Sequence, residues 1–281
     1  MYNLKGKVAM VTGTARKKGM GRAFVQRLAE EGADIVVQSR YRPPEEYPEW
    51  EKMEGWKGLD SLVEEVEALG HQAVAVTGDI CVREEVEQMV AKALARFGHI
   101  DILVNNAGLH SSEDRDRILD MPEEKWNSYM TTNVNGTLWM SQAVAKSMKE
   151  HGQGGKIILM SSSAALHPAS EAHGAYYGIS KLAMLGLCHC MAAEFAPYNI
   201  NVNTVLPAAI TLPVDGRGIK YMEGIHKGLG EEEAMAYAYP EGLNRPPASA
   251  MANLVAFLAS SQSDCLTDQI IEGGRFAALR R

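Results

Sequence analysis

The 281-residue sequence has no run of about eighteen apolar residues, the length that a membrane-spanning helix requires. Its first apolar segment is also too short for a signal sequence, and we therefore expect a cytoplasmic protein. Clusters of lysine and arginine are scarce, and the formal net charge is −7. Because surfaces for nucleic acid and for anionic membranes need such clusters, we expect neither among the partners of this chain.

Cysteine is also scarce. The four cysteines, Cys81, Cys188, Cys190 and Cys265, show no CxxC spacing, and without a secretory context we interpret them as reduced thiols. The triplet "CHC" at 188–190 does not indicate a metal site, because neighbouring residues of a helix point about 100° apart and cannot all face one ion. We therefore expect no metal.

Seven apolar, β-branched runs are spread along the chain, and segments with helical periodicity separate most of them. The segment "GRAFVQRLAEEG" is one of these, with Phe24 and Leu28 on its apolar side and Gly32 as a stop signal. Strands that alternate with helices predict a parallel sheet covered on both faces, and right-handed crossovers make it doubly wound. We therefore predict one α/β domain over 1–281 with a seven-stranded, doubly wound parallel sheet. The runs begin at Lys7, Asp34, Gln72, Ile100, Lys156, Ile200 and Asp268.

A doubly wound sheet binds its ligands in a crevice beyond the carboxyl ends of its strands, where the winding reverses. The loops after the first and fourth predicted strands flank that point. The first of these loops contains "TGTARKKGMG" from Thr12, and the second contains "NNAG" from Asn105. The predicted ligand site therefore lies between these two loops.

Two segments interrupt the alternation of strands and helices. Residues 41–58 hold three prolines and two tryptophans without periodicity. We interpret this insertion as a surface loop, with a flap over a cofactor or a subunit contact as the alternatives. Residues 213–247 carry Tyr221, Met222 and Tyr237 among glycines and charges, and we predict that they form a lid over a substrate pocket.

Five motifs follow one another along nearly the entire chain: "TGTARKKGMG", "NNAG", "NVNG" from Asn133, "MSSS" from Met160 and "YGISK" from Tyr177. In this order they resemble the short-chain dehydrogenase/reductase family, and the five together are far more specific than any one of them. The resemblance implies a Rossmann-type fold, an NAD(P)-dependent oxidoreductase and a homotetramer. It also implies a secondary alcohol or ketone as the small-molecule substrate, without identifying which one.

Tyr177 and Lys181 are four residues apart, so on a helix they share one face. A lysine ammonium there would favour the phenolate form of the tyrosine, whose pKa is ordinarily near 10. Bringing that pKa close to neutrality needs roughly 4 kcal/mol, which we attribute to Lys181 and the positive charge of an oxidised nicotinamide ring. Tyr177 is therefore the predicted general acid or base.

The resemblance assigns roles to three further side chains. It implies that Ser162 hydrogen-bonds the reacting oxygen and that Lys181 also holds the ribose hydroxyls. Asn133 would position a water molecule that relays protons to the lysine. Ser163 is the alternative to Ser162, because the stretch from the serines to Tyr177 is longer than is usual in the family.

The first motif departs from the family pattern, because five residues, 14–18, separate Gly13 from Gly19, which is more than the pattern has. Gly19 and Gly21 still directly precede a predicted helix. Backbone amides and the helix N-terminus can therefore meet a pyrophosphate, and we expect the extra length to bulge towards the adenosine ribose.

The charges near the predicted ribose favour NADP, with NAD as the alternative. Ser39 stands where NAD-preferring relatives have a carboxylate, and Arg40 follows it. Arg16, Lys17 and Lys18 add positive charge from the longer loop. Several cations beside a hydroxyl would attract a 2′-phosphate, which a carboxylate would repel.

Further cofactor contacts are implied by the resemblance. Asp79 would meet the adenine edge, and Asn106 would line the adenosine side of the crevice. After the sixth strand the chain has Ala208 and Leu212 where the family has a glycine and a threonine, so Thr211 is a candidate from one position earlier. The predicted cofactor-binding residues are Gly13, Arg16, Lys18, Gly19, Met20, Gly21, Ser39, Arg40, Asp79, Ile80, Asn106, Ala107, Gly108, Tyr177, Lys181, Pro207 and Thr211.

A cofactor-binding sensor or scaffold without catalysis is the alternative function. The presence of Asn133, Ser162, Tyr177 and Lys181 together disfavours it, since such a protein has no physical need for all four. No Walker A phosphate loop occurs in the sequence, which leaves ATP chemistry without support.

Overall fold

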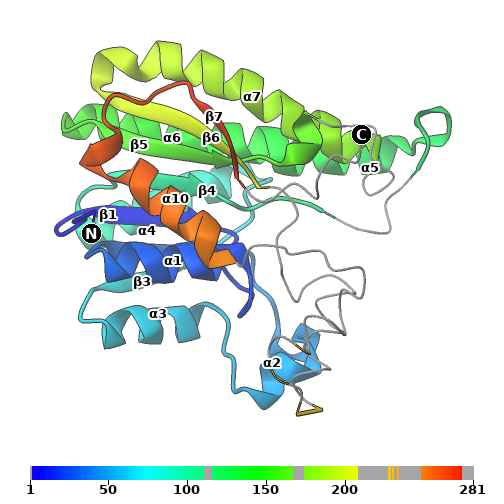
Figure 1. The fold of residues 1–281 in the computed structure, drawn as a ribbon, viewed down its shortest axis with the longest axis horizontal. Helices are drawn as coiled ribbons and strands as arrows, with labels where there is room; N and C mark the ends of the chain where they lie inside the picture. Colours follow the sequence, from blue (N-terminus) through cyan, green and yellow to red (C-terminus); the bar gives the residue numbers. More distant parts are fainter. Residues whose placement is uncertain are drawn as a thin grey trace.

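A single parallel sheet of seven strands runs through the computed structural model, in the order β3-β2-β1-β4-β5-β6-β7 (Figure 1). The number of strands and their parallel pairing confirm the predicted doubly wound sheet. The structure describes residues 2–110, 116–166, 174–207, 227–228, 230, 233 and 248–273. The strands are β1 (Val8–Thr12), β2 (Asp34–Ser39), β3 (Ala73–Thr77), β4 (Ile102–Asn105), β5 (Gly155–Met160), β6 (Ile200–Pro207) and β7 (Ile270–Gly273).

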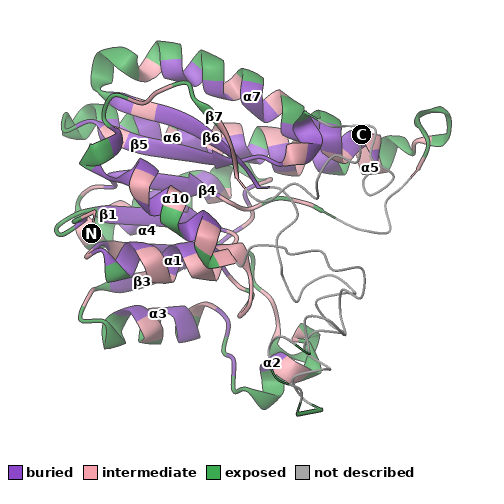
Figure 2. Ribbon diagram, in the orientation of Figure 1, coloured by how far each residue is buried: buried purple, intermediate pink, exposed green. Residues whose placement is uncertain are grey.

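Helices cover both faces of the sheet. Successive residues of a strand point to opposite faces, so Met10 and Val11 of β1 belong to different halves of the hydrophobic core. Every residue of β1 is therefore buried, and Figure 2 shows the sheet as the most buried layer. One face carries α1 (Met20–Glu30), α3 (Leu59–Ala68) and α10 (Ala248–Ala259), and the other carries α4 (Arg83–Phe97), α6 (Gly136–His151) and α7 (Ala175–Phe195).

Helix α7 is long and apolar enough, by length and composition alone, to cross a membrane. Residues along it, including Met184 and Cys188, are buried, and the helix packs against β6. Its contacts in the structure are those of a helix in a protein core.

The winding of the sheet reverses between β1 and β4, and the loops that follow these strands meet there. Asn106 Nδ2 donates hydrogen bonds to the carbonyl oxygens of Thr12 at 2.7 Å and Gly13 at 3.1 Å. The Thr12 hydroxyl accepts from the backbone N–H of Ala107 at 2.9 Å. The two loops are therefore tied together where the ligand site is predicted.

Residues 41–58 differ from the interpretation as a surface loop. They contain the 3-10 turn η1 (Pro44–Glu46) and the short helix α2 (Glu49–Met53), which Figure 1 shows apart from the sheet. Glu51 is only 1% exposed and Trp56 only 5%. The burial of these two side chains shows that the insertion packs against another part of the chain, which is the loop between β1 and α1.

Candidate active site

The catalytic candidates lie after the carboxyl end of β5 and on α7. Ser162 follows β5 and caps the short turn η4 (Ser163–Ala165), where its hydroxyl accepts a backbone hydrogen bond at 3.2 Å. Tyr177 and Lys181 lie one turn apart on α7, with 5.9 Å between Lys181 Nζ and the centre of the Tyr177 ring. The structure therefore brings these three side chains to one place.

Tyr177 is partly exposed and flanked by aromatic rings. The His110 ring meets it edge-on with 4.9 Å between centroids, and the Tyr129 ring does so at 6.3 Å. Burial raises the pKa of Tyr177, and a hydrogen bond with the Ser162 side chain opposes that rise. Desolvation of the phenol is the largest effect on this pKa in the protein alone, and the lowering by Lys181 together with an oxidised nicotinamide ring stays a prediction for the complex with cofactor. The hydrogen bond selects Ser162 rather than Ser163 as the neighbour of Tyr177.

Lys181 is held deep inside the protein, with 5% of its surface exposed. Its ammonium donates to the carbonyl oxygen of Met160 at 2.9 Å and contacts the sulfur of Met184 at 3.6 Å. No carboxylate pairs with it among the residues that the structure describes. Burial without a counter-ion lowers the pKa of Lys181 to about 8.

Asn133 is fully buried and joins the loop after β4 to α7. It lies within the π-helical segment η3 (Met130–Asn135), and π-helical turns often occur at functional sites. Its Oδ1 accepts from the backbone N–H of Leu109 at 2.7 Å, and its Nδ2 donates to Ser180 Oγ at 2.9 Å and to the Leu109 carbonyl at 3.2 Å. The amide therefore fixes the distance between the loop and the catalytic helix.

The "NNAG" loop lies directly against the catalytic side chains. A Cβ atom added to Gly108 would lie 3.1 Å from Asn133 Oδ1 and 3.3 Å from Lys181 Nζ. Only glycine therefore fits at this position without displacing one of these two groups. The predicted cofactor loop and the predicted catalytic residues form one continuous site.

The glycine-rich loop has the shape that a pyrophosphate requires. Gly13 has a positive φ of 71°, and a Cβ added there would lie 2.7 Å from Ala107 Cα. A Cβ on Gly21 would lie 2.7 Å from the Gly13 carbonyl oxygen. Gly19 caps α1 without any side-chain hydrogen bond, so the first amides of the helix, from Met20 on, remain available to an anion. These residues fit a nicotinamide dinucleotide.

The residues predicted to bind the adenosine end of the cofactor differ in their exposure. Arg40 is 74% exposed at its side chain and lies 3.7 Å from the carboxylate of Asp79. Ser39 ends β2 and is partly exposed. The Ile80 side chain is buried against Gly136, so it faces the core, and only its backbone is left for a cofactor.

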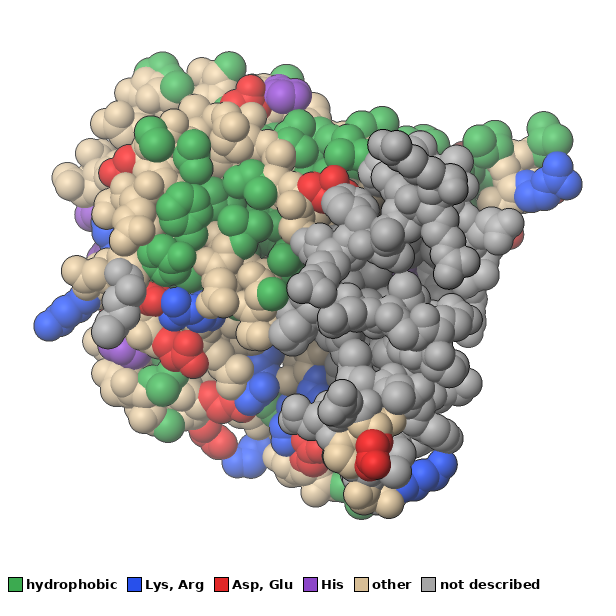
Figure 3. All heavy atoms as spheres, in the orientation of Figure 1, with side chains coloured by type: hydrophobic (Ala, Val, Ile, Leu, Met, Phe, Trp, Pro, Cys, Tyr) green, Lys and Arg blue, Asp and Glu red, His purple; other side chains and the backbone are tan. Residues whose placement is uncertain are grey.

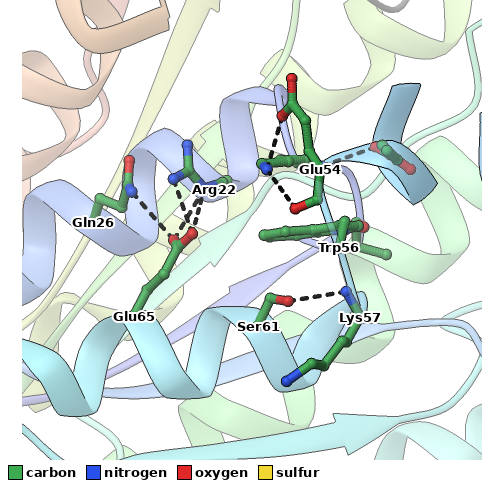
Figure 4. Close-up of polar contacts among 10 residues, drawn as sticks. Arg22, Gln26, Glu54, Trp56, Lys57, Ser61 and Glu65 are labelled. Carbon is green, nitrogen blue, oxygen red and sulfur yellow. Dashed lines mark hydrogen bonds and ion pairs between the residues drawn. The ribbon is translucent and has the colours of Figure 1, made fainter. Parts of the chain in front are cut away.

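The positive charges of the longer loop are not all equivalent. Lys17 Nζ pairs with Glu54 of the insertion at 2.7 Å, and Lys18 Nζ lies 3.7 Å from the same carboxylate. Figure 4 shows Glu54 beside Trp56 in this contact region. Arg16 is exposed and has no ion-pair partner among the described residues. Lys17 and Lys18 therefore already have a counter-ion, which the sequence did not reveal.

Some predicted residues lie outside the part of the chain that the structure describes. These are Thr211, with its neighbours Ala208 and Leu212, and nearly all of the predicted lid at 213–247. Pro207 is described, as the last residue of β6.

Sequence reasoning missed several residues that support the site. Gln38 accepts a hydrogen bond from the Gly13 N–H at 3.3 Å and donates to the Gly78 carbonyl at 2.8 Å. It is a polar residue in an otherwise apolar stretch of β2, and that contrast was a signal for it. Ser180, within "YGISK", was overlooked as the partner of Asn133.

The chain is similar along almost its whole length to known proteins. A family model described as short chain dehydrogenase matches residues 7–217. L-rhamnose 1-dehydrogenase (NAD(P)(+)) of Azotobacter vinelandii is 34% identical over 279 residues, covering 98% of both chains. 2-dehydro-3-deoxy-D-gluconate 5-dehydrogenase of Escherichia coli is 33% identical over 284 residues, also covering 98% of both. Carveol dehydrogenase from Mycobacterium avium, solved in complex with NAD, has a TM-score of 0.78 at 27% identity and 97% coverage of each chain.

Proposed function

The chain belongs to the short-chain dehydrogenase/reductase family, and we propose that its Tyr177 hydroxyl transfers the proton that accompanies hydride transfer. The protein is an NAD(P)-dependent oxidoreductase that acts on alcohols, in line with its relatives. The observation that carries the proposed role is the hydrogen bond between Tyr177 and Ser162, with Lys181 one helical turn away. Two hydroxyls that converge in this way can bind one substrate oxygen together.

The proposed reaction interconverts a secondary alcohol and a ketone. The bound nicotinamide supplies or accepts the hydride at the substrate carbon. Tyr177 donates its proton to the carbonyl oxygen during reduction and takes the hydroxyl proton during oxidation, while Ser162 hydrogen-bonds the same oxygen. The nearby Lys181 ammonium stabilises the phenolate that forms after donation. Among the residues that the structure describes, Asn133 Oδ1 accepts one hydrogen bond, from the Leu109 N–H, so its second lone pair can accept from a water molecule on the proton path.

We assign a preference for NADP over NAD. Ser39 has a hydroxyl where NAD-preferring relatives have a carboxylate. Arg16, before Ser39 in the sequence, and Arg40, after it, are exposed cations. Arg16 is the stronger candidate for the 2′-phosphate because Arg40 already faces Asp79. Lys17 and Lys18 have a smaller part in this assignment, since they share the carboxylate of Glu54, which offsets one of their two charges.

A cytoplasmic homotetramer is the proposed assembly. Figure 3 shows hydrophobic side chains gathered over α7, β7 and α10 on one face of the molecule. Ile179 and Leu182 of α7 are 36% and 48% exposed, and Ile270 of β7 is 36% exposed. Exposed apolar side chains that cluster in this way support a contact between subunits. Analytical ultracentrifugation gives the tetramer mass if the proposal holds, and a monomer mass would overturn it.

Reduced-cofactor absorbance tests the reaction across a panel of secondary alcohols and ketones, with NAD and NADP compared side by side. The panel includes the sugar and sugar-acid substrates that the names of the relatives specify. The proposal predicts turnover with at least one member and a preference for NADP. Preference for NAD by a wide margin would contradict the cofactor assignment. Dinucleotide binding without any turnover would favour the sensor or scaffold.

The variant Arg16→Ala tests the cofactor assignment at one residue. Loss of a charge-assisted contact to the 2′-phosphate raises KM for NADP by about tenfold and leaves KM for NAD unchanged. Arg83→Ala is the matched control, because Arg83 is an exposed arginine on α4 that pairs within its own helix at 3.8 Å. Equal losses with both cofactors would remove Arg16 from the phosphate site.

A further inference from the structure

The insertion at 41–58 is bound to the backbone of the glycine-rich loop through Glu51. Glu51 Oε1 accepts a hydrogen bond from the backbone N–H of Lys17 at 3.0 Å. Its other oxygen accepts from Arg42 Nη1 at 2.9 Å, and the side chain is 1% exposed. A buried carboxylate with two charge-assisted or backbone hydrogen bonds holds its partners firmly, because breaking either contact leaves charge unsatisfied in the interior.

Trp56 binds the same loop from the end of the insertion. Its indole N–H donates to the carbonyl oxygen of Ala15 at 2.9 Å. The ring lies beside α1, with the guanidinium carbon of Arg22 5.9 Å from its centroid, and Figure 4 shows the two side chains close together. Arg22 is fixed in turn by Glu65 of α3 at 2.9 Å. The indole therefore lies between the glycine-rich loop and the first turn of α1.

The loop needs external support because of its length. Residues 14–18 contain no glycine. A backbone hydrogen bond forms within the loop, from the Gly19 N–H to the Arg16 carbonyl oxygen at 3.3 Å. Thr14 is anchored at the start by Gln38 at 3.0 Å. The middle of the loop, at Ala15 and Lys17, is held by the insertion.

We propose that Glu51 and Trp56 are positioning residues for the nicotinamide dinucleotide, acting through the glycine-rich loop. This inference rests on the proposed function, since it takes that loop as the pyrophosphate site. With both contacts made, the loop is already ordered before the cofactor binds. The phosphates can then bind at Gly19, Met20 and Gly21 without a loss of conformational entropy in the loop. The insertion thereby makes the middle of the loop rigid. Because both residues act through the backbone of the loop, we expect them to affect NAD and NADP alike.

Calorimetric titration of NAD and NADP into the full-length protein, without substrate, tests this role. Glu51→Gln weakens the contact to the Lys17 N–H, and Trp56→Phe keeps the ring but removes the donor to Ala15. We expect each variant to raise Kd by about tenfold for NAD and NADP equally, the effect of losing one buried hydrogen bond. At saturating cofactor, kcat stays at the wild-type value.

Two control variants separate positioning from general destabilisation. Glu49→Gln changes an exposed carboxylate on α2 that pairs with Lys52 at 3.7 Å. Ser61→Ala removes a buried hydroxyl that accepts from the Lys57 N–H at 2.9 Å, so it loosens the end of the insertion next to Trp56 and leaves both contacts to the glycine-rich loop in place. We expect wild-type Kd values from both. The inference is overturned if Glu51→Gln and Trp56→Phe bind both cofactors as wild type does, or if Ser61→Ala weakens binding as much as they do.

The outcome is distinguishable from failure of the proposed function. Wild-type protein that binds a dinucleotide but turns over no alcohol or ketone defeats the proposed activity, while the Kd comparison still decides the role of Glu51 and Trp56. If Glu51→Gln weakened the binding of NADP and left the binding of NAD unchanged, Glu51 would act at the 2′-phosphate. That result would overturn the inference that it positions the whole loop.

Discussion

Replacing Lys181 with methionine is predicted to stabilise the folded protein at neutral pH while removing activity. The pKa of a lysine in the unfolded chain is 10.5, whereas burial lowers that of Lys181 to about 8 in the fold. Each pKa unit corresponds to about 1.4 kcal/mol, so the buried ammonium costs about 3 kcal/mol of folding free energy at pH 7. Methionine has no charge to desolvate and fills a similar volume next to Met184.

The stability difference between Lys181→Met and the wild type is predicted to change sign with pH. Between pH 8 and pH 10.5 the unfolded chain binds a proton that the folded chain has lost, so wild-type stability rises with pH across that window. Lys181→Met lacks this dependence and loses the hydrogen bond to the Met160 carbonyl, worth about 1 kcal/mol. The variant is therefore more stable than wild type by about 2 kcal/mol at pH 7, and less stable above pH 10.5.

Urea unfolding at a series of pH values measures this difference. Lys92→Met is the matched control, because Lys92 also donates to a backbone carbonyl, that of Ala75 at 3.0 Å, but is exposed. The control shows no gain at pH 7. A Lys181→Met variant that is less stable than wild type at pH 7, or whose difference from wild type is the same at every pH, would refute the account of a buried, unpaired ammonium.

Four further substitutions test the site. Gly21→Ala places a methyl carbon 2.7 Å from the Gly13 carbonyl oxygen, so dinucleotide affinity in calorimetry falls by about tenfold, and unchanged affinity would contradict the close approach. Asn133→Ala removes the three hydrogen bonds of a buried side chain and lowers the free energy of unfolding by about 3 kcal/mol in a urea titration, whereas a loss below about 1 kcal/mol would contradict this account. Ser162→Ala lowers kcat by about a hundredfold and Ser163→Ala leaves it near wild type, and the reverse order would move the catalytic role to Ser163.

The strands and the catalytic pair could be predicted because local sequence determines them. The first four residues of β1, Val8 to Val11, are all apolar, as expected for a strand that is buried on both faces. The spacing of Tyr177 and Lys181 places them on one face wherever α7 forms. Neither inference needed knowledge of distant contacts.

The role of the insertion could not be read from the sequence, because it depends on contacts between distant residues. Helix α2 has only five residues, too few for a periodic pattern. Glu51 and Trp56 are buried by the loop residues Lys17 and Ala15, which come 34 and 41 positions earlier in the chain. For the same reason, counting the positive charges of the loop did not show that Lys17 and Lys18 share the carboxylate of Glu54, which offsets one of their two charges.

The direction of the Tyr177 pKa shift also could not be predicted from the sequence. Spacing places Lys181 one turn away, but it does not show that the ammonium donates to the Met160 carbonyl or that desolvation dominates at the phenol. The balance between a nearby charge and burial is set by the packed structure.

Single-turnover hydride transfer in Tyr177→Phe, compared with Tyr176→Phe, tests the central claim most directly. The Tyr176 hydroxyl is committed to Asp116 at 2.7 Å, so this neighbouring phenol is a matched control. We predict that Tyr177→Phe binds NADP as wild type does and loses about a thousandfold in rate, while Tyr176→Phe stays near the wild-type rate. A Tyr177→Phe protein that reduces its ketone as fast as wild type would contradict the proton-transfer role of this residue.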